Sequence, residues 1–242
     1  VMPGFAVMHD VTDSDIDFSG ENYDFTLMNV KAKDRQTDFA IDPYFNPVKF
    51  TIPQYNFRIG YQLKKNLDFS FGIDHMKYVV EQNQKSIING VIDINSTYDG
   101  NYSNDSIYIS ENFLKFEHTD GLNYVNLEAR NSGLIIKFKN WAIQHIEGIG
   151  LGLMIPKTNT TLMGMDRHDN FHFSGYGVGG IIGINLLFKD RYFIQIESKS
   201  GFIHMPNIRT TNFKNDRANQ HFFFIQQNIV FGGFITLNKK QY

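Results

Sequence analysis

The chain has 242 residues, enough for one domain but too few for two independent cores, so we expect a single domain over residues 1–242. Its formal net charge of −2 offers no basic excess to hold a phosphate backbone, which argues against a nucleic-acid partner. The absence of cysteine excludes disulfides, thiolate metal sites and cysteine nucleophiles. No run reaches the roughly 18 apolar residues of a membrane-spanning helix.

Alternation of polar and apolar residues predicts eight strands. In residues 55–63 the odd positions are apolar and the even positions are Asn, Arg, Gly or Gln. Because successive side chains of a strand point to opposite faces, this segment has one apolar and one polar face. The predicted strands are residues 2–10, 55–63, 67–74, 122–138, 141–155, 171–188, 192–204 and 220–237.

The connections between these strands alternate in length. Three are tight, at residues 65–66, 139–140 and 189–191. Four are long, at about residues 11–51, 79–120, 156–170 and 205–219. Short turns at one rim and long loops at the other, with an even strand number, are typical of bacterial outer-membrane proteins. The predicted fold class is therefore all-β: a closed antiparallel transmembrane β-barrel of about eight strands.

A soluble barrel is the alternative, with the apolar faces inside and the polar faces in water. The charges on the polar faces favour the membrane arrangement, because three cations and three carboxylates would balance one another inside. Buried charges need such partners. The expected interior charge network comprises Arg58, Asp68, Glu128, Arg130, Glu197 and Lys199.

This pattern resembles the small eight-stranded outer-membrane barrels of the OmpA and OmpX type. The segments PYFNPVKFTIPQYNFRIGY and RHDNFHFSGYGVGG are similar to sequences of outer-membrane proteins of the Bacteroidota. The resemblance covers almost the whole chain in architecture but includes no diagnostic motif. It implies a location in the bacterial outer membrane, with the lipid bilayer and lipopolysaccharide as neighbours.

One candidate metal site lies in the first long loop. Asp13, Asp15 and Asp17 have the spacing of the first three ligands of a calcium loop, and Asp24 falls at its twelfth position. Phe18 stands where such a loop needs glycine, so a solvated acidic loop is the alternative reading. We expect no other cofactor.

The leading functional hypothesis is a non-enzymatic outer-membrane protein that binds a partner through its two longest loops. It would be an accessory subunit of a larger assembly, secretion or transport complex in the envelope. These loops carry aromatic side chains of the kind that anchor interfaces. They are Tyr23, Phe25, Tyr44, Phe45, Tyr98, Tyr102, Tyr108 and Phe113.

Two other functions stay open at this point. A lipid-modifying enzyme of the lipid A deacylase or acyltransferase type would need a nucleophile, a base and an acid in contact. The candidates are Ser198, Ser200 and His204, with His145 and Glu147 on another strand. A narrow pore or lipid-binding barrel is the third hypothesis, since glycines in residues 148–152 and 175–183 contribute little interior volume.

Overall fold

The computed structural model describes residues 1–35, 42, 54–118, 121–165, 167 and 170–235. Within them are sixteen strands: β1 (Met2–Val11), β2 (Ser14–Ser19), β3 (Tyr23–Val30), β4 (Ala32–Lys33), β5 (Tyr55–Lys64), β6 (Leu67–Met76), β7 (Val79–Val80), β8 (Gln84–Ile92), β9 (Gly100–Ile109), β10 (Leu114–Glu117), β11 (Leu122–Lys137), β12 (Trp141–Pro156), β13 (Asn159–Leu162), β14 (Gly175–Phe188), β15 (Tyr192–Arg209) and β16 (Arg217–Gly233). None of the helical structure in these residues is long and apolar enough to cross a membrane.

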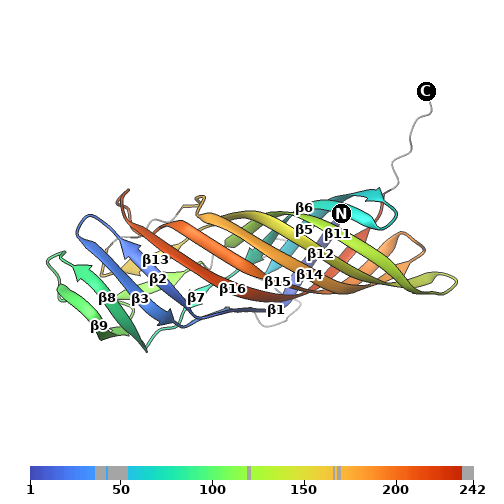
Figure 1. The fold of residues 1–242 in the computed structure, drawn as a ribbon. Coiled ribbons are helices and arrows are strands. Elements are labelled where there is room, and N and C mark those ends of the chain that lie inside the picture. The colour runs from blue at the N-terminus through green and yellow to red at the C-terminus, as the bar shows by residue number, and fades with distance from the viewer. Residues whose placement is uncertain (36–41, 43–53, 119–120, 166, 168–169, 236–242) are drawn as a thin grey trace, which may run out of the picture.

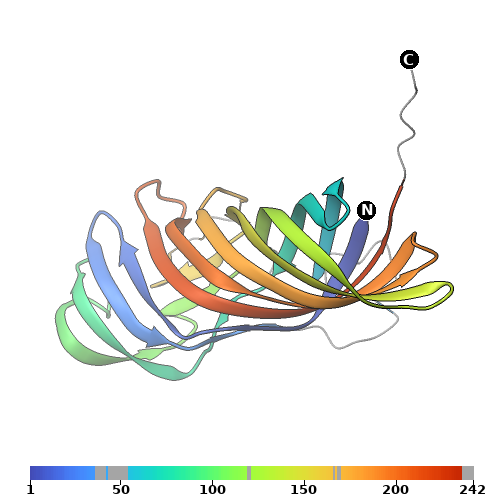
Figure 2. The same cartoon turned by 45° about the vertical axis from the view of Figure 1, so that its right-hand side comes forward.

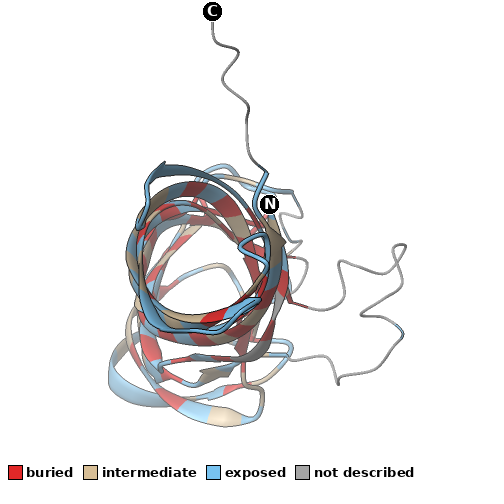
Figure 3. Ribbon diagram, turned by 90° about the vertical axis from the view of Figure 1, so that its right-hand side faces the viewer, coloured by how far each residue is buried: buried red, intermediate tan, exposed pale blue. Residues whose placement is uncertain are grey.

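Twelve strands form one large antiparallel sheet in the order β1-β5-β6-β11-β12-β14-β15-β16-β2-β3-β8-β9. Because β1 pairs with both β5 and β16, the first eight strands of this sheet, from β1 to β16 in the order given, encircle a common axis (Figures 1 and 3). We call these eight strands the strand ring. The ring is uneven, since β1 and β5 pair only over residues 2–5 and 55–58, whereas β15 and β16 pair from Tyr192 to Arg209.

The prediction of a closed barrel of about eight strands with long loops at one rim is therefore wrong. The tight turns are present, but the segments expected as long loops contain β2, β3, β8, β9 and a separate four-stranded sheet. The large sheet continues past β16 into β2, β3, β8 and β9, and we call these four strands the extension (Figure 2). The error has a simple physical source: β2 alternates buried and exposed residues over SDIDFS, and its aspartates suggested a loop.

The four-stranded sheet, in the order β13-β10-β7-β4, packs on the extension through aromatic side chains. Phe18 of β2 lies edge-on to Phe116 of β10, with ring centroids 5.9 Å apart. Phe25 of β3 lies 6.1 Å from Phe113. Both pairs are within the range in which aromatic rings attract. The extension and the four-stranded sheet thus enclose apolar side chains between them.

This core continues into the adjacent end of the strand ring. Tyr78 stacks on Phe222 of β16 at 5.0 Å, and Tyr124 of β11 lies 6.3 Å from Phe224. Met205 of β15 is fully buried in the same cluster. The extension and the ring therefore share one apolar core, which positions the extension rigidly at the end of the ring that lies opposite the tight turns.

Candidate functional site

The outer face of the strand ring is apolar and exposed. Strand alternation directs Val178, Ile182 and Ile184 of β14 outward, while Gly177 and Ile181 point inward. Ile149 of β12 is 72% exposed and Ile182 is 67% exposed. Large contiguous apolar surfaces are uncommon on monomeric soluble proteins and mark contact with a membrane or a partner.

Aromatic side chains border this apolar belt at both ends. Trp141, Phe188 and Tyr192 are register neighbours at the tight-turn end, and the rings of Trp141 and Phe188 lie 4.4 Å apart. Tyr176 and His204 are register neighbours twelve residues further along their strands, at a ring distance of 5.5 Å. Twelve residues of strand span ~40 Å, and the tilt of about 40° that is typical of transmembrane barrels would give a belt about 30 Å high. That height matches the hydrocarbon core of a bilayer.

A row of polar side chains crosses the middle of the belt. Asn131, Glu147, Ile182, Ser198 and Gln227 are register neighbours on β11, β12, β14, β15 and β16. Asn131 Nδ2 donates a hydrogen bond to Glu147 Oε1 at 3.0 Å, and Gln227 Nε2 donates one to Ser198 Oγ at 3.0 Å. The exposed Glu147 carboxylate thus lies among exposed isoleucines.

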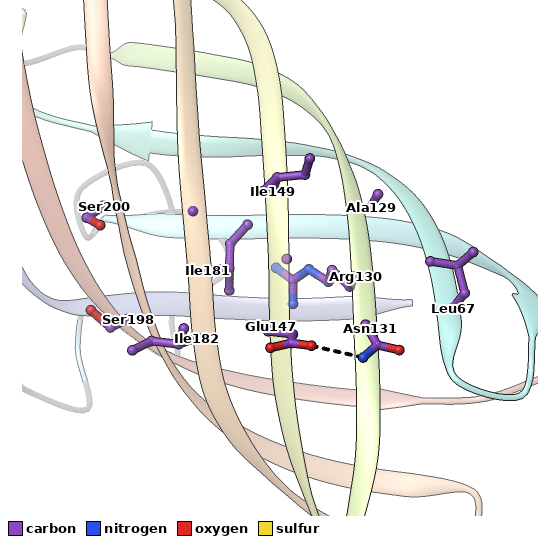
Figure 4. Close-up of a pocket in the computed structure, with 12 residues that line it drawn as sticks. Leu67, Ala129, Arg130, Asn131, Glu147, Ile149, Ile181, Ile182, Ser198 and Ser200 are labelled. Carbon is purple, nitrogen blue, oxygen red and sulfur yellow. Dashed lines mark hydrogen bonds between the residues drawn. The ribbon is translucent and has the colours of Figure 1, made fainter.

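The same region is hollowed. A depression of about 490 Å³ lies between the polar row and the next row of the sheet, and Figure 4 shows Glu147, Asn131 and the two serines around it. Its lining includes two isoleucines with exposed side chains, Ile149 and Ile182, and several small residues: Ala129, Gly148, Gly180, Ser198 and Ser200. A second depression of about 700 Å³ adjoins it toward His145 and Ile196, and both include Glu147, Ile182 and Ser198. We call the two together the outer hollow.

The lumen of the strand ring contains a buried ion network. Arg58 pairs with Asp74 at 2.9 Å and with Glu128 at 2.8 Å. Arg130 pairs with Glu128 at 2.7 Å and with Glu197 at 2.8 Å. Lys199 contacts both Asp74 and Glu128. Three cations and three carboxylates therefore balance, and all six side chains are at most 5% exposed.

The structure brings together five of the six residues expected inside: Arg58, Glu128, Arg130, Glu197 and Lys199. The third carboxylate is Asp74, whereas Asp68 is half-buried on β6 and is the register neighbour of Arg130. Both aspartates lie on the polar face that alternation assigns to this strand. The sequence alone does not reveal which aspartate contacts Lys199, because this contact depends on the register of the strands around the ring.

Three of the four calcium candidates lie on strands. Asp15 and Asp17 are on the exposed face of β2. Asp15 accepts a hydrogen bond from the Asn29 backbone N–H at 2.7 Å, and Asp17 accepts one from the Thr26 hydroxyl at 2.7 Å. Asp13 precedes β2, and Asp24 is on β3. Within the described part of the chain, no group of three or more His, Asp or Glu side chains is placed to hold a metal ion.

The residues considered for lipid hydrolysis are spread over the outer face. Glu147 and Ser198 share the polar row, but β14 lies between their strands. The Ser198 hydroxyl accepts its hydrogen bond from Gln227, and His204 lies at the aromatic end of the belt. No hydrogen bond joins Ser198 to His145 or Glu147 in the described structure, so these residues do not form a nucleophile–base pair there.

Most aromatic residues expected as exposed loop anchors belong to the core. Tyr23, Phe25 and Phe113 are buried, and Tyr98 and Tyr102 are partly buried against the same cluster. Tyr108 of β9 is 51% exposed. Tyr44 and Phe45 lie outside the described residues. The extension therefore uses its aromatic residues mainly to fold, and Tyr108 is the exposed exception among those described.

One buried histidine, His118, lies beside the four-stranded sheet and outside the strand ring. His118 follows β10, and its Nδ1 lies 3.0 Å from the Thr158 hydroxyl. Burial, with a contribution from nearby His172, lowers the pKa of His118 to about 3. The imidazole is therefore neutral in the folded protein at neutral pH.

The comparisons with known proteins leave the family open. No protein-family model matches the chain, and no curated protein matches it. Functional conclusions therefore depend on the geometry described above.

Proposed function

We propose that this chain is a non-enzymatic protein of the bacterial outer membrane. The strand ring sits in the lipid bilayer, with lipopolysaccharide beside it in the outer leaflet. The extension stands outside the membrane and binds another envelope protein, so that the chain acts as an accessory subunit of a larger complex.

The polarity of the strand ring is the observation that carries the membrane location. Its outer face exposes isoleucine, leucine and phenylalanine, while its lumen buries six charged side chains. Water around such a ring would meet an extensive apolar surface, which favours aggregation. A bilayer instead buries that surface, and the aromatic ends of the belt suit the two lipid–water interfaces.

The free edge of the large sheet supports the partner-binding role. β9 is the last strand of the sheet, and in the described structure it pairs only with β8. An edge strand presents unpaired backbone groups to which another chain can add a strand. Tyr108 is exposed on this edge and supplies an aromatic anchor.

Membrane location is tested by expressing the chain in a Gram-negative host and floating the membranes on a density gradient. The proposal predicts that the protein floats with the outer-membrane fraction and resists extraction by carbonate and urea. Recovery in the soluble fraction would contradict it.

Partner binding is tested by copurification from the native envelope in mild detergent. Tyr108→Ser should reduce recovery of a stoichiometric partner, because it removes the exposed aromatic side chain at the sheet edge. Phe213→Ser is the matched control: Phe213 is also an exposed aromatic residue, at 66%, but it lies in the connection between β15 and β16. Recovery of a monomer alone, or equal losses in both variants, would count against binding at β9.

A further inference from the structure

The outer hollow combines features that lipid alone does not explain. Glu147 lies six residues from Trp141, in the middle of the apolar belt, and its side chain is exposed. An ionisable group facing acyl chains is unfavourable, and such residues usually pair with another polar group. Asn131 donates one hydrogen bond to Glu147, which leaves most of the carboxylate's acceptor capacity open to a second partner.

We propose that a second copy of this chain docks on the outer hollow, forming a two-fold symmetric dimer within the membrane. This inference rests on the proposed membrane location. It assigns the polar row to an interface between copies, separate from the partner edge at β9.

Charge complementarity within a single patch identifies the occupant. His145 and Glu147 are two residues apart on β12, so both point outward from the same strand. Both border the second part of the hollow. In a two-fold interface the same patch faces itself, so an acid and a base on one patch can pair twice, each with its counterpart on the other copy. A patch that carried only the acid or only the base would need a different protein to supply the second group of each pair.

Shape supports the same occupant. Ile182 borders both depressions, so an exposed isoleucine lies directly beside a hollow whose lining includes several small residues. A two-fold axis can place Ile182 of each copy into the hollow of the other. Small residues in the lining allow the backbones to approach closely, as they do in other interfaces within membranes. Copies inserted in the same direction have their two-fold axis along the membrane normal, which keeps the two polar rows at equal depth.

Cysteine cross-linking tests the dimer directly, because the chain has no cysteine of its own. Membranes containing S198C are treated with a short bis-maleimide and analysed by denaturing electrophoresis. The proposal predicts a product at twice the 28.0 kDa chain mass. F71C is the matched control, because Phe71 is an exposed residue of the same belt on β6, away from the hollow. It should remain monomeric.

The pairing is tested by exchanging the acid and the base, Glu147 and His145, in the S198C background. E147K should reduce the cross-linked fraction about ten-fold, which corresponds to about 1.4 kcal/mol, because it removes both inter-copy pairs. The exchange H145E/E147H should restore cross-linking, since it reverses each pair without removing it. Heat-dependent electrophoretic mobility of each variant reports whether its strands are folded.

Three results would overturn the proposal: a labelled but monomeric S198C protein, a cross-linked product of another mass, or an unchanged dimer in folded E147K. A product of another mass would assign the hollow to a different protein. Membrane flotation of the same samples reports the proposed location independently. A floating monomer contradicts the dimer alone, whereas a protein that stays at the bottom of the gradient contradicts the membrane location.

Discussion

Removing one cation from the lumen provides a quantitative test of the ion network. Lys199 contacts both Asp74 and Glu128, and all three side chains are at most 2% exposed. Lys199→Met keeps much of the side-chain volume but leaves three carboxylates facing two guanidinium groups. Breaking a buried ion pair by removing one partner typically costs about 3–5 kcal/mol. We expect the free energy of unfolding to fall by that amount.

The matched double variant separates charge balance from packing. Asp74→Asn together with Lys199→Met leaves Arg58 and Arg130 opposite Glu128 and Glu197, so the lumen is neutral again. We expect the double variant to be more stable than Lys199→Met alone, with a coupling energy of about 1–3 kcal/mol.

Both energies can be measured by reversible unfolding in urea with the protein in lipid vesicles. Fluorescence of the single tryptophan, Trp141, reports folding. A loss below about 1 kcal/mol for Lys199→Met would refute the reasoning, because an uncompensated buried charge should destabilise the folded state by more than that. Additive effects in the double variant would show that the two side chains do not interact.

Three further predictions concern other parts of the fold. Ile149→Arg, near the middle of the apolar belt, should destabilise the vesicle-bound protein by about 2–4 kcal/mol, whereas Ser103→Arg at an exposed position of β9 should change its urea midpoint little; equal shifts would argue against an apolar environment at Ile149. Because the pKa of His118 is about 3 when folded and near 6.5 when unfolded, only the unfolded chain takes up this proton as the pH falls below 6.5. The resulting stability is present above pH 6.5 and decreases by about 2 kcal/mol at pH 5, a loss that unfolding curves of His118→Gln should lack. Gly90→Ala should destabilise more than Gly164→Ala in the same unfolding assay: both glycines have positive φ, but an added Cβ at Gly90 would lie 2.2 Å from the Asp24 carbonyl oxygen and at Gly164 would meet open space. Equal losses would assign the effect to backbone strain alone.

Alternation in the sequence locates the long strands well. The segment predicted at residues 122–138 corresponds to β11, Leu122–Lys137, and the segment predicted at 141–155 corresponds to β12, Trp141–Pro156. These strands have one polar and one apolar face over many residues, which is the strongest signal that a single sequence offers. Tight turns such as residues 139–140 then set which strands are neighbours.

The first strand of the extension escaped prediction because it is short and its exposed positions are strongly polar. In β2 the exposed Asp15 and Asp17 alternate with the buried Ile16 and Phe18. Aspartates two residues apart are equally typical of a calcium loop, so composition pointed to a loop where alternation pointed to a strand. The pairing of β2 with β16 joins segments about 200 residues apart in the sequence, and no local pattern encodes it.

The composition of the polar row on the outer face also depends on strand register, which the sequence pattern does not encode. Alternation assigned Glu147 and Ser198 to the outer face, but only the pairing of β12, β14 and β15 places them in one row. The aromatic residues of the extension were assigned to binding because they are abundant there. They are buried in a common core with Met205 and Phe222, and this core depends on the second sheet, whose strands of two to four residues are too short to show a clear alternation.

Depth-dependent quenching of Trp141 tests most directly whether the strand ring faces lipid. Trp141 is the only tryptophan in the chain and lies at the tight-turn end of the belt, with its ring centroid 4.4 Å from that of Phe188. In vesicles of brominated lipids, we predict strongest quenching by bromines near the headgroups. In the variant W141F/I149W, which places the tryptophan two residues from Glu147 and close to the middle of the belt, the bromines near the bilayer centre should quench most strongly. Quenching of both tryptophans by acrylamide in water, with no effect from any brominated lipid, would contradict the membrane location of the strand ring.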